Sequence, residues 1–278
     1  FAMFIYGVDQ AKAISMLRGE LPADSIRKEY PTTLFTQQQK KPTGPVKLPP
    51  KAQTRGKKHP YSRVYAYLNK SRGIDPAIIT DMVNRKQLYE DDHHNCVFVG
   101  FDKDSNPAFA CARGTSTYRE KPFRRDMENS RKEVAFYVDN QASRLFVCEA
   151  PIDAMSLMTM LKMNKIDYKK FDYLAVAGMC YDTLPYHLER LGVDQVKTIY
   201  LAPDNDEKGE EIRRGYREQL EQLGFPGKVI DKIPLSKDWN QDLCNLREIN
   251  QNIKQLPKAQ QQNNPKAPQQ ERERSIAL

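Results

Sequence analysis

Short apolar runs alternate with helical segments throughout the second half of the chain. The runs that predict strands cover 144–150, 173–178, 197–203 and 228–233. The segments between them have the residue spacing of helices, which we expect over 152–164, 183–192 and 208–224. Because helices that connect consecutive strands produce parallel sheets, we predict an α/β domain over residues 144–250, with a parallel sheet covered by helices on both faces.

A smaller α+β subdomain is predicted upstream, over residues 61–143. Two helices should meet at 72–76, where Asp75 is placed to cap the second helix and Pro76 to begin it. Strands are expected at 95–102 and 106–115, joined by a turn, and a further strand at 134–138.

Three other segments lack this alternation. Residues 1–20 have apolar residues near helical spacing and predict a short helix. Residues 31–60 contain six prolines and predict an extended linker. Residues 251–278 are rich in Gln, Asn, Pro and Lys, which predicts a disordered tail.

Charge and cysteine content narrow the class of protein. The formal net charge is +8, and residues 31–60 alone hold seven Lys or Arg and no acid, so the rest of the chain is close to neutral. A basic linker attracts a phosphate backbone, but the charge alone does not indicate a nucleic-acid-binding domain. No run of about 18 apolar residues is present, so no membrane partner is expected. The five cysteines are widely spaced, without a C-x-x-C pair, and predict a reduced, cytoplasmic protein.

Acidic residues follow two of the predicted strands directly. Glu149 ends the first strand, and Asp153 lies one turn into the next helix. Asp204 and Asp206 follow the third strand, in the stretch "IYLAPDNDEKGEE". Carboxyl ends of parallel strands meet at one edge of a sheet, so these acids should converge there, where oxygen ligands favour Mg²⁺ or Mn²⁺. A polar turn and acids that interact with helix dipoles remain alternatives.

"LFVCEAPIDAMSL" together with "IYLAPDNDEKGEE" resembles the toprim domain of bacterial primases, topoisomerases and some nucleases. The resemblance implies a Rossmann-like sheet, acid/base catalysis by Glu149 with Asp153 beside it, and a divalent metal at Asp204 and Asp206. The glycine that usually follows the family's glutamate is Ala150 here. "PLSKDWNQDL" resembles the element that closes the metal site in primase-type toprim domains. This adds Asp238 as a metal ligand, with Asp242 as a weaker candidate and a helix cap as the alternative for Asp238.

The upstream region also resembles a primase core. The stretches that carry the likeness are "YLNKSRGIDPAIITDM", "VFVGFDKDSNPAFACARGT" and "RRDMENSRKEVAFYV". In primases this subdomain supplies basic residues for template and nucleotide, which maps onto Arg72, Arg113, Arg131 and Lys132. Each of these could instead be a solvated surface charge. The combination is closest to toprim proteins of plasmids and mobile elements, in which a zinc ribbon usually comes first. Residues 1–30 resemble the end of that ribbon, so the chain is expected to be a fragment, and zinc is expected only if an upstream ribbon exists.

The leading interpretation is therefore a primase-like nucleotidyltransferase that makes RNA primers on single-stranded DNA with Mg²⁺, for plasmid or mobile-element replication. Its expected partners are a single-stranded DNA template, nucleoside triphosphates and a replicative helicase. Two alternatives remain open: a metal-dependent toprim nuclease, and a non-catalytic DNA-binding accessory protein. A topoisomerase is disfavoured because no separate domain with a nucleophilic tyrosine is present.

Overall fold

The computed structural model describes residues 42, 44–53, 61–118, 123–178 and 180–255. The helix expected at 1–20, the ribbon-like segment 1–30 and residues 256–278 of the predicted tail lie outside the described residues. The helices within the described part of the chain include none that is long and apolar enough to cross a membrane.

A five-stranded sheet forms the centre of the second domain, in the order β5-β7-β6-β8-β9. Its strands are β5 (Phe136–Val138), β6 (Arg144–Cys148), β7 (Asp172–Ala175), β8 (Thr198–Leu201) and β9 (Lys228–Asp231). The last four strands are mutually parallel, whereas β5 pairs with β7 in the antiparallel direction. The predicted α/β sheet is confirmed, with one antiparallel strand added at its edge.

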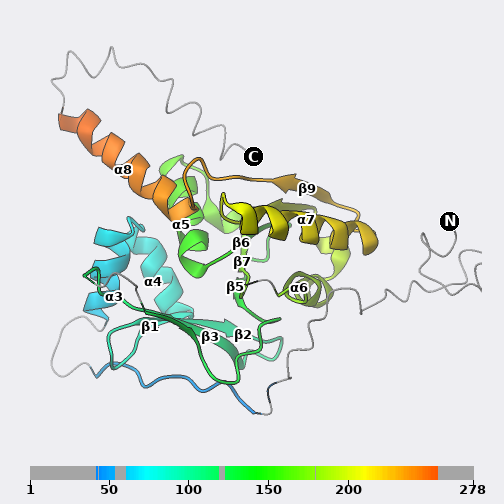
Figure 1. Cartoon of the computed structure of the whole chain (residues 1–278), viewed down its shortest axis with the longest axis horizontal. Coiled ribbons are helices and arrows are strands. Elements are labelled where there is room, and N and C mark those ends of the chain that lie inside the picture. The colour runs from blue at the N-terminus through cyan, green and yellow to red at the C-terminus, as the bar shows by residue number, and fades with distance from the viewer. Residues whose placement is uncertain (1–41, 43, 54–60, 119–122, 179, 256–278) are drawn as a thin grey trace, which may run out of the picture.

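Helices cover both faces of this sheet, as predicted. The helices are α5 (Pro151–Met163), α6 (Thr183–Leu191), α7 (Glu207–Gln222) and α8 (Trp239–Gln255), with short 3₁₀ turns η3 (Tyr168–Lys170) and η4 (Val193–Gln195). Successive side chains of a strand point to opposite faces. Accordingly, Phe146 of β6 packs in the cluster that includes α5 and α8, and Val147 packs in the cluster that includes α6 and α7. Helix α8 continues to Gln255, past the start of the predicted tail, and its end extends away from the sheets (Figure 1).

The upstream subdomain consists of a four-stranded antiparallel sheet and a helical layer. Its strands are β1 (Leu88–Glu90), β2 (Cys96–Phe101), β3 (Pro107–Arg113) and β4 (Arg124–Asp126), and its helices are α3 (Ser62–Ala66), the π-helix η2 (Tyr67–Ser71) and α4 (Pro76–Asn84). Asp75 caps α4 as expected, because its carboxylate accepts the N–H of Ala77 at 2.8 Å, and Pro76 begins the helix.

The two domains share one hydrophobic core. Phe98 of β2 meets Phe136 of β5 edge to face, with ring centroids 5.8 Å apart. Gly100 lies so close that an added Cβ would be 1.6 Å from the carbonyl oxygen of Ala135. The strand at 134–138, which sequence reasoning grouped with the upstream subdomain, therefore belongs to the second sheet, and it ties the two sheets together.

Part of the predicted linker packs on the upstream sheet. Within residues 44–53, the N–H of Ala52 donates to the carbonyl of Glu90 at 2.8 Å, and the N–H of Lys47 donates to the carbonyl of Glu128 at 3.0 Å. The chain here is extended, as expected, but it follows the sheet because backbone hydrogen bonds fix its path.

Candidate functional site

A cleft of about 590 Å³ lies between the two domains. One wall is formed by the carboxyl ends of β6, β7 and β8 together with the loop that precedes α8. The opposite wall is formed by β2, β3 and β4 of the upstream sheet. The acidic side chains that line it are Asp126, Glu149, Asp153, Asp204 and Asp238, and the basic ones are Arg72, Arg113, Arg124, Arg125, Lys132 and Lys237.

Glu149 and Asp204 lie side by side at the bottom of the acidic wall. Glu149 follows β6, and its Oε1 accepts the backbone N–H of Asp204, which follows β8, at 3.1 Å. Trp239 holds the same strand end, because its indole Nε1 donates to the carbonyl of Ala202 at 2.8 Å. The adjacent parallel strands β6 and β8 thus bring together two acids that are far apart in sequence.

Asp204 is the most perturbed of the partly accessible acids. Its Oδ1 is buried and has no hydrogen-bond partner among the described residues. Burial raises the pKa of Asp204 to about 7, with further contributions from the charges of Glu149, Asp238 and Asp206, while Lys237 opposes the shift. A buried oxygen without a partner, surrounded by other carboxylates, favours either a proton or a cation.

Asp153 lies deeper, on the buried first turn of α5. Burial raises its pKa well above the usual range, and the charges of Asp204 and Asp238 add to the shift, while the backbone amide of Asn240 opposes it. Burial and the neighbouring carboxylates therefore both disfavour the charged form of Asp153.

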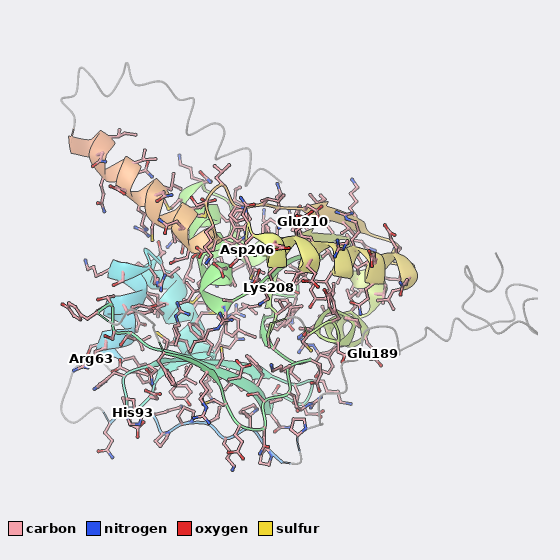
Figure 2. All side chains as sticks on the ribbon, viewed as in Figure 1. Arg63, His93, Glu189, Asp206, Lys208 and Glu210 are labelled. Carbon is pink, nitrogen blue, oxygen red and sulfur yellow. The ribbon has the colours of Figure 1, made fainter. Side chains whose placement is uncertain are left out.

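Asp206 and Asp238 both cap helices with one carboxylate oxygen. Asp206 Oδ1 accepts the N–H of Gly209 at 2.9 Å at the start of α7, and Asp238 Oδ1 accepts the N–H of Gln241 at 2.7 Å at the start of α8. Asp238 also lines the cleft, so its role as a helix cap does not remove it from the candidate site. Asp206 does not line it and lies at the N-terminal end of α7 (Figure 2).

Asp242, the weaker candidate, does not reach the cleft. Its two carboxylate oxygens accept the N–H groups of Leu235 and Ser236, each at 2.7 Å. It is buried and fixes the loop that carries Lys237 and Asp238.

The acids of the cleft have the donor atoms that a divalent cation prefers, but they are not arranged as a complete coordination site. Within the described ranges, no three His, Cys, Asp or Glu side chains already converge as a metal-binding group. The unpartnered oxygen of Asp204 and the carboxylates of Glu149 and Asp238, whose charges act on it, are nevertheless all oxygen donors. Such donors suit Mg²⁺, which keeps several waters and needs only one or two carboxylates.

The basic wall contains three of the four predicted cations. Arg113 ends β3, and its buried Nε has no hydrogen-bond partner in the described part of the chain. The Nζ of Lys132 lies 3.5 Å from Oδ2 of Asp126. Arg72, at the end of η2, lines the same cleft. Arg124, Arg125 and Lys237 also line the cleft. Sequence reasoning quoted the stretches that hold these three but did not select them, because only the pairing of β3 with β4 brings Arg124 and Arg125 to the wall.

Arg131 is the predicted cation that the structure does not bring to the cleft. Its Nε lies 2.8 Å from Glu133 Oε1, and its guanidinium is also near Asp102 and over the ring of Tyr186. The carboxylates of Glu133 and Asp102 therefore compensate the positive charge of Arg131.

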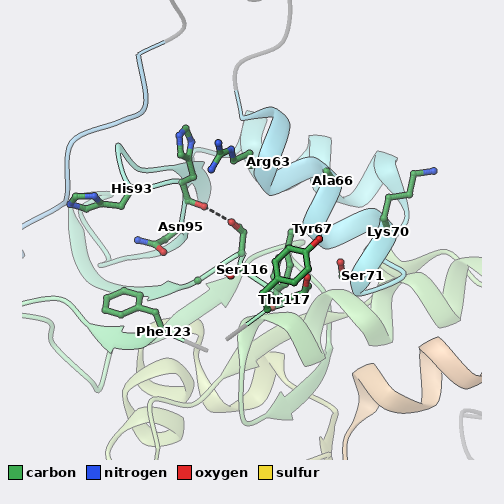
Figure 3. A pocket seen from close by; sticks show the side chains of 14 residues that line it. Arg63, Ala66, Tyr67, Lys70, Ser71, His93, Asn95, Ser116, Thr117 and Phe123 are labelled. Atoms are coloured by element: carbon green, nitrogen blue, oxygen red, sulfur yellow. Dashed lines mark hydrogen bonds between the residues drawn. The ribbon is translucent and has the colours of Figure 1, made fainter. Parts of the chain in front are cut away.

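A second cavity, of about 770 Å³, adjoins the cleft along the upstream subdomain. Figure 3 shows Arg63, Tyr67 and Lys70 on the helical side of this cavity and His93, Asn95 and Phe123 on the side of the sheet. The described residues that line it include no Asp or Glu. Consecutive residues line the two cavities at three places, namely Ser71 and Arg72, Arg113 and Gly114, and Phe123 and Arg124.

Comparison with known families agrees with this arrangement. Residues 146–243 match the family model described as "Toprim-like", and residues 66–143 match the model described as "Protein of unknown function (DUF3991)". The chain therefore contains a toprim-like domain preceded by a DUF3991 domain. No curated protein matches the chain.

The solved structures to which the chain is similar include several primases. The primase fragment of the bacteriophage T7 primase-helicase protein is 20% identical, with a TM-score of 0.47, over 66% of this chain and 69% of that chain. The Aquifex aeolicus primase, with its zinc-binding and RNA polymerase domains, is 12% identical, with a TM-score of 0.41, over 90% of this chain and 68% of that chain. The RNA polymerase domain of Mycobacterium tuberculosis primase, in complex with a DNA oligomer, is 13% identical, with a TM-score of 0.42, over 70% of this chain and 75% of that chain.

Proposed function

We propose that this protein is a primase-like nucleotidyltransferase, which extends RNA primers on single-stranded DNA in the cleft between its two domains. The observation that carries the proposal is the opposition of the two walls. Carboxylates crowd the strand ends of a toprim-like domain, and six basic side chains line the same cleft. A triphosphate and a phosphodiester backbone need cations, whereas a divalent metal needs the acids.

The acids of the cleft would divide the chemistry between them. Asp204, with Glu149 and Asp238 beside it, would hold Mg²⁺ or Mn²⁺, and Asp206 would strengthen the site through its charge. A bound divalent cation would neutralise the phosphates of the incoming nucleotide. The Oε1 of Glu149 is engaged by the N–H of Asp204, which leaves Oε2 to accept a proton.

In the proposed reaction, the 3′-hydroxyl oxygen of the growing primer forms a bond to the α-phosphorus of a nucleoside triphosphate. The bond from that phosphorus to the bridging oxygen breaks, and pyrophosphate leaves. The hydroxyl proton goes to Glu149 or, through water, to solvent. Arg113, Lys132 and Arg72 would bind the triphosphate or the template backbone, and no oxidant or reductant is required.

The second cavity supports a single-stranded partner. Among the described residues, its lining combines cations with the aromatic rings of Tyr67, Tyr118 and Phe123 and includes no carboxylate, and it continues the basic wall of the cleft. Flat rings beside cations suit unpaired bases and their backbone. We propose that the template strand passes from the cleft into this cavity.

The test is incorporation of labelled ribonucleotides on single-stranded DNA with Mg²⁺, in which wild type is compared with Asp204→Asn and Arg131→Ala. Synthesis that is abolished by Asp204→Asn and retained by Arg131→Ala is expected. Metal-dependent loss of the input DNA without synthesis would identify a nuclease instead. Binding of DNA without either reaction would identify an accessory protein, and in both of these cases the primase proposal is wrong.

A further inference from the structure

Asn240 connects three segments that meet at the mouth of the cleft. Its Nδ2 donates to the carbonyl of Arg72 at 2.8 Å and to Ser156 Oγ of α5 at 3.0 Å. Its Oδ1 accepts Nη1 of Arg72 at 3.1 Å. The side chain is 4% exposed, so a buried amide uses both of its ends between the two domains.

Asn240 belongs to a three-residue unit at the start of α8 whose members point to different parts of the site. Asp238 lines the cleft and caps the helix, and Trp239 donates to the carbonyl of Ala202 at the end of β8. Asn240 binds Arg72 of the upstream subdomain. The unit therefore fixes the distance between the carboxylates at the strand ends and one cation of the opposite wall.

Arg72 is held on several sides but keeps one nitrogen available. Its Nε donates to the hydroxyl of Tyr67 at 2.8 Å, and its guanidinium carbon lies 5.3 Å from the centre of that ring. Asn240 accepts from Nη1 at 3.1 Å. Nη2 has no hydrogen-bond partner among the described residues, and Arg72 lines the cleft. An oriented guanidinium with a free donor is suited to a phosphate oxygen, because little side-chain entropy is lost on binding.

We infer that Asn240 is a positioning residue, which aims Arg72 at the phosphates of a nucleotide bound by the acidic wall. This inference rests on the proposed function and adds a residue that acts through another. Asn240 itself need not touch the nucleotide. Without its amide, Arg72 loses both the acceptor for Nη1 and the donor to its own carbonyl, and the guanidinium is no longer fixed relative to Asp238. Asn240 and Arg72 should therefore contribute to nucleotide binding as one unit.

The test is a double-mutant cycle on nucleotide affinity. The probe is a nucleoside triphosphate with a methylene group in place of the α–β bridging oxygen, titrated calorimetrically with Mg²⁺ into wild type, Arg72→Ala, Asn240→Ala and the double variant. Each single substitution should weaken binding about tenfold, which is the range for a lost hydrogen bond to a charged group. The double variant should also bind the probe only about tenfold more weakly than wild type, since the second substitution removes no further interaction.

Two further variants separate positioning from general stability. Asn245→Ala changes an asparagine of the same helix whose Nδ2 bonds Ser236 Oγ outside the cleft, and it should leave the affinity unchanged. Ser156→Ala removes one of the two acceptors of Asn240 while Arg72 stays intact, and it should weaken binding about threefold. Urea unfolding of each variant reports folding independently, and Ser156→Ala carries the test if Asn240→Ala does not fold.

Additive effects in the cycle, an unchanged affinity of Asn240→Ala, or a wild type that does not bind the probe would each overturn the inference. The probe cannot be turned over at the α–β bridge, so its binding is measured independently of primer synthesis. A coupled cycle in a protein that makes no primers would reject the proposed function and keep the role of Asn240. Primer synthesis together with additive effects in the cycle would support the proposed function and reject the role of Asn240.

Discussion

The backbone N–H of Asp204 donates to Oε1 of Glu149 at 3.1 Å, which joins the ends of two adjacent parallel strands through one residue's backbone and the other's side chain. This bond keeps the Glu149 carboxylate beside Asp204 without neutralising either charge. It accounts for part of the raised pKa of Asp204, which is caused first by burial and next by Glu149. A divalent cation would offset this concentration of negative charge at Asp204.

Replacement of Asp204 by Asn should separate stability from activity. The amide removes a charge that is repelled by Glu149 and Asp238, so in metal-free buffer the free energy of unfolding at pH 8 should rise by about 1 kcal/mol, after allowance for the exposed part of the side chain. Primer synthesis should fall at least about 100-fold, as for other groups that stabilise charge in a transition state. Urea denaturation and ribonucleotide incorporation measure the two effects. A destabilised variant would contradict this account of the site.

The raised pKa of Asp204 predicts how this residue makes stability depend on pH. Asp204 has a pKa of about 7 in the folded protein, above the value of 3.8 for the free group, so the folded state binds more protons in the interval between these values. The contribution of Asp204 to stability should therefore increase as the pH falls from 8 towards 5, so the wild type should gain stability relative to Asp204→Asn over this interval. The buried His187, whose pKa burial lowers to about 3, opposes this gain equally in both proteins, so the difference between them isolates Asp204. Mg²⁺ competes with the proton, so it should raise the melting temperature more at pH 8 than at pH 6. Thermal melts at both values, with and without Mg²⁺, decide the matter.

The sequence predicted the sheet and the edge of the site well because their signals are local. Apolar runs and helical spacing identified four parallel strands, and the acids at their ends fall where parallel strands place them. The direction in which each acidic side chain points could not be predicted from the sequence. Asp204 and Asp206 share the stretch D-N-D, yet Asp204 lines the cleft while Asp206 caps α7. Both residues follow the end of β8, and Asn205 between them bonds the backbone of Lys237 and Pro234.

The basic wall was less predictable because it depends on long-range pairing. Strands β1 and β4 have only three residues each, too few for an alternation signal, so they were not expected. Arg124 and Arg125 reach the cleft through the pairing of β4 with β3. Arg131 was chosen for its charge and its place in a basic stretch, but Glu133 and Asp102 compensate it outside the cleft. No residue spacing along the chain distinguishes these cases.

Arg113 and Arg131 offer a matched pair for the role of the basic wall. Arg113→Ala removes a guanidinium whose buried Nε has no partner among the described residues, and it should weaken nucleotide or DNA binding about tenfold or more. Arg131→Ala removes a guanidinium that is paired with Glu133 and should change binding less than about twofold. Fluorescence anisotropy with a labelled oligonucleotide, at two salt concentrations, measures both. Equal losses for the two variants would show that only the overall charge matters.

Gly209 should be indispensable for the geometry of the loop that holds Asp204 and Asp206. An added Cβ would lie 1.9 Å from the carbonyl oxygen of Asp204, which is too close to be accommodated without moving the backbone. Gly209→Ala should therefore destabilise the protein by about 1–3 kcal/mol and reduce Mg²⁺ affinity, because Asp204 is displaced. Gly44→Ala is the control, since its Cβ would make an ordinary contact of 3.5 Å with Asn129. Calorimetric Mg²⁺ titration and urea denaturation test both substitutions, and retained Mg²⁺ affinity in Gly209→Ala would show that the loop can adjust.

Asp206→Asn separates the two effects of Asp206, namely its negative charge near the site and its hydrogen bond that caps α7. Asparagine caps helices about as well as aspartate, so the bond to the N–H of Gly209 should persist and the unfolding free energy should change by less than about 0.5 kcal/mol. The lost charge should weaken Mg²⁺ binding severalfold, much less than Asp204→Asn, because Asp206 acts on the site from outside the cleft. A loss of Mg²⁺ affinity equal to that of Asp204→Asn would make Asp206 a direct ligand.

The second cavity yields the sharpest test of a single-stranded partner, because Tyr118 is 99% exposed and so has little packing against the described residues to lose. Tyr118→Ala should leave the unfolding free energy unchanged. It should weaken single-stranded DNA binding by roughly 1–3 kcal/mol if a base stacks on the ring, while double-stranded DNA should show little change because its bases are already stacked. Leu235→Ala is a suitable control, since Leu235 is 51% exposed and lies outside this cavity. Anisotropy titrations with both forms of DNA measure the difference, and an unchanged single-strand affinity would remove this cavity from the path of the template.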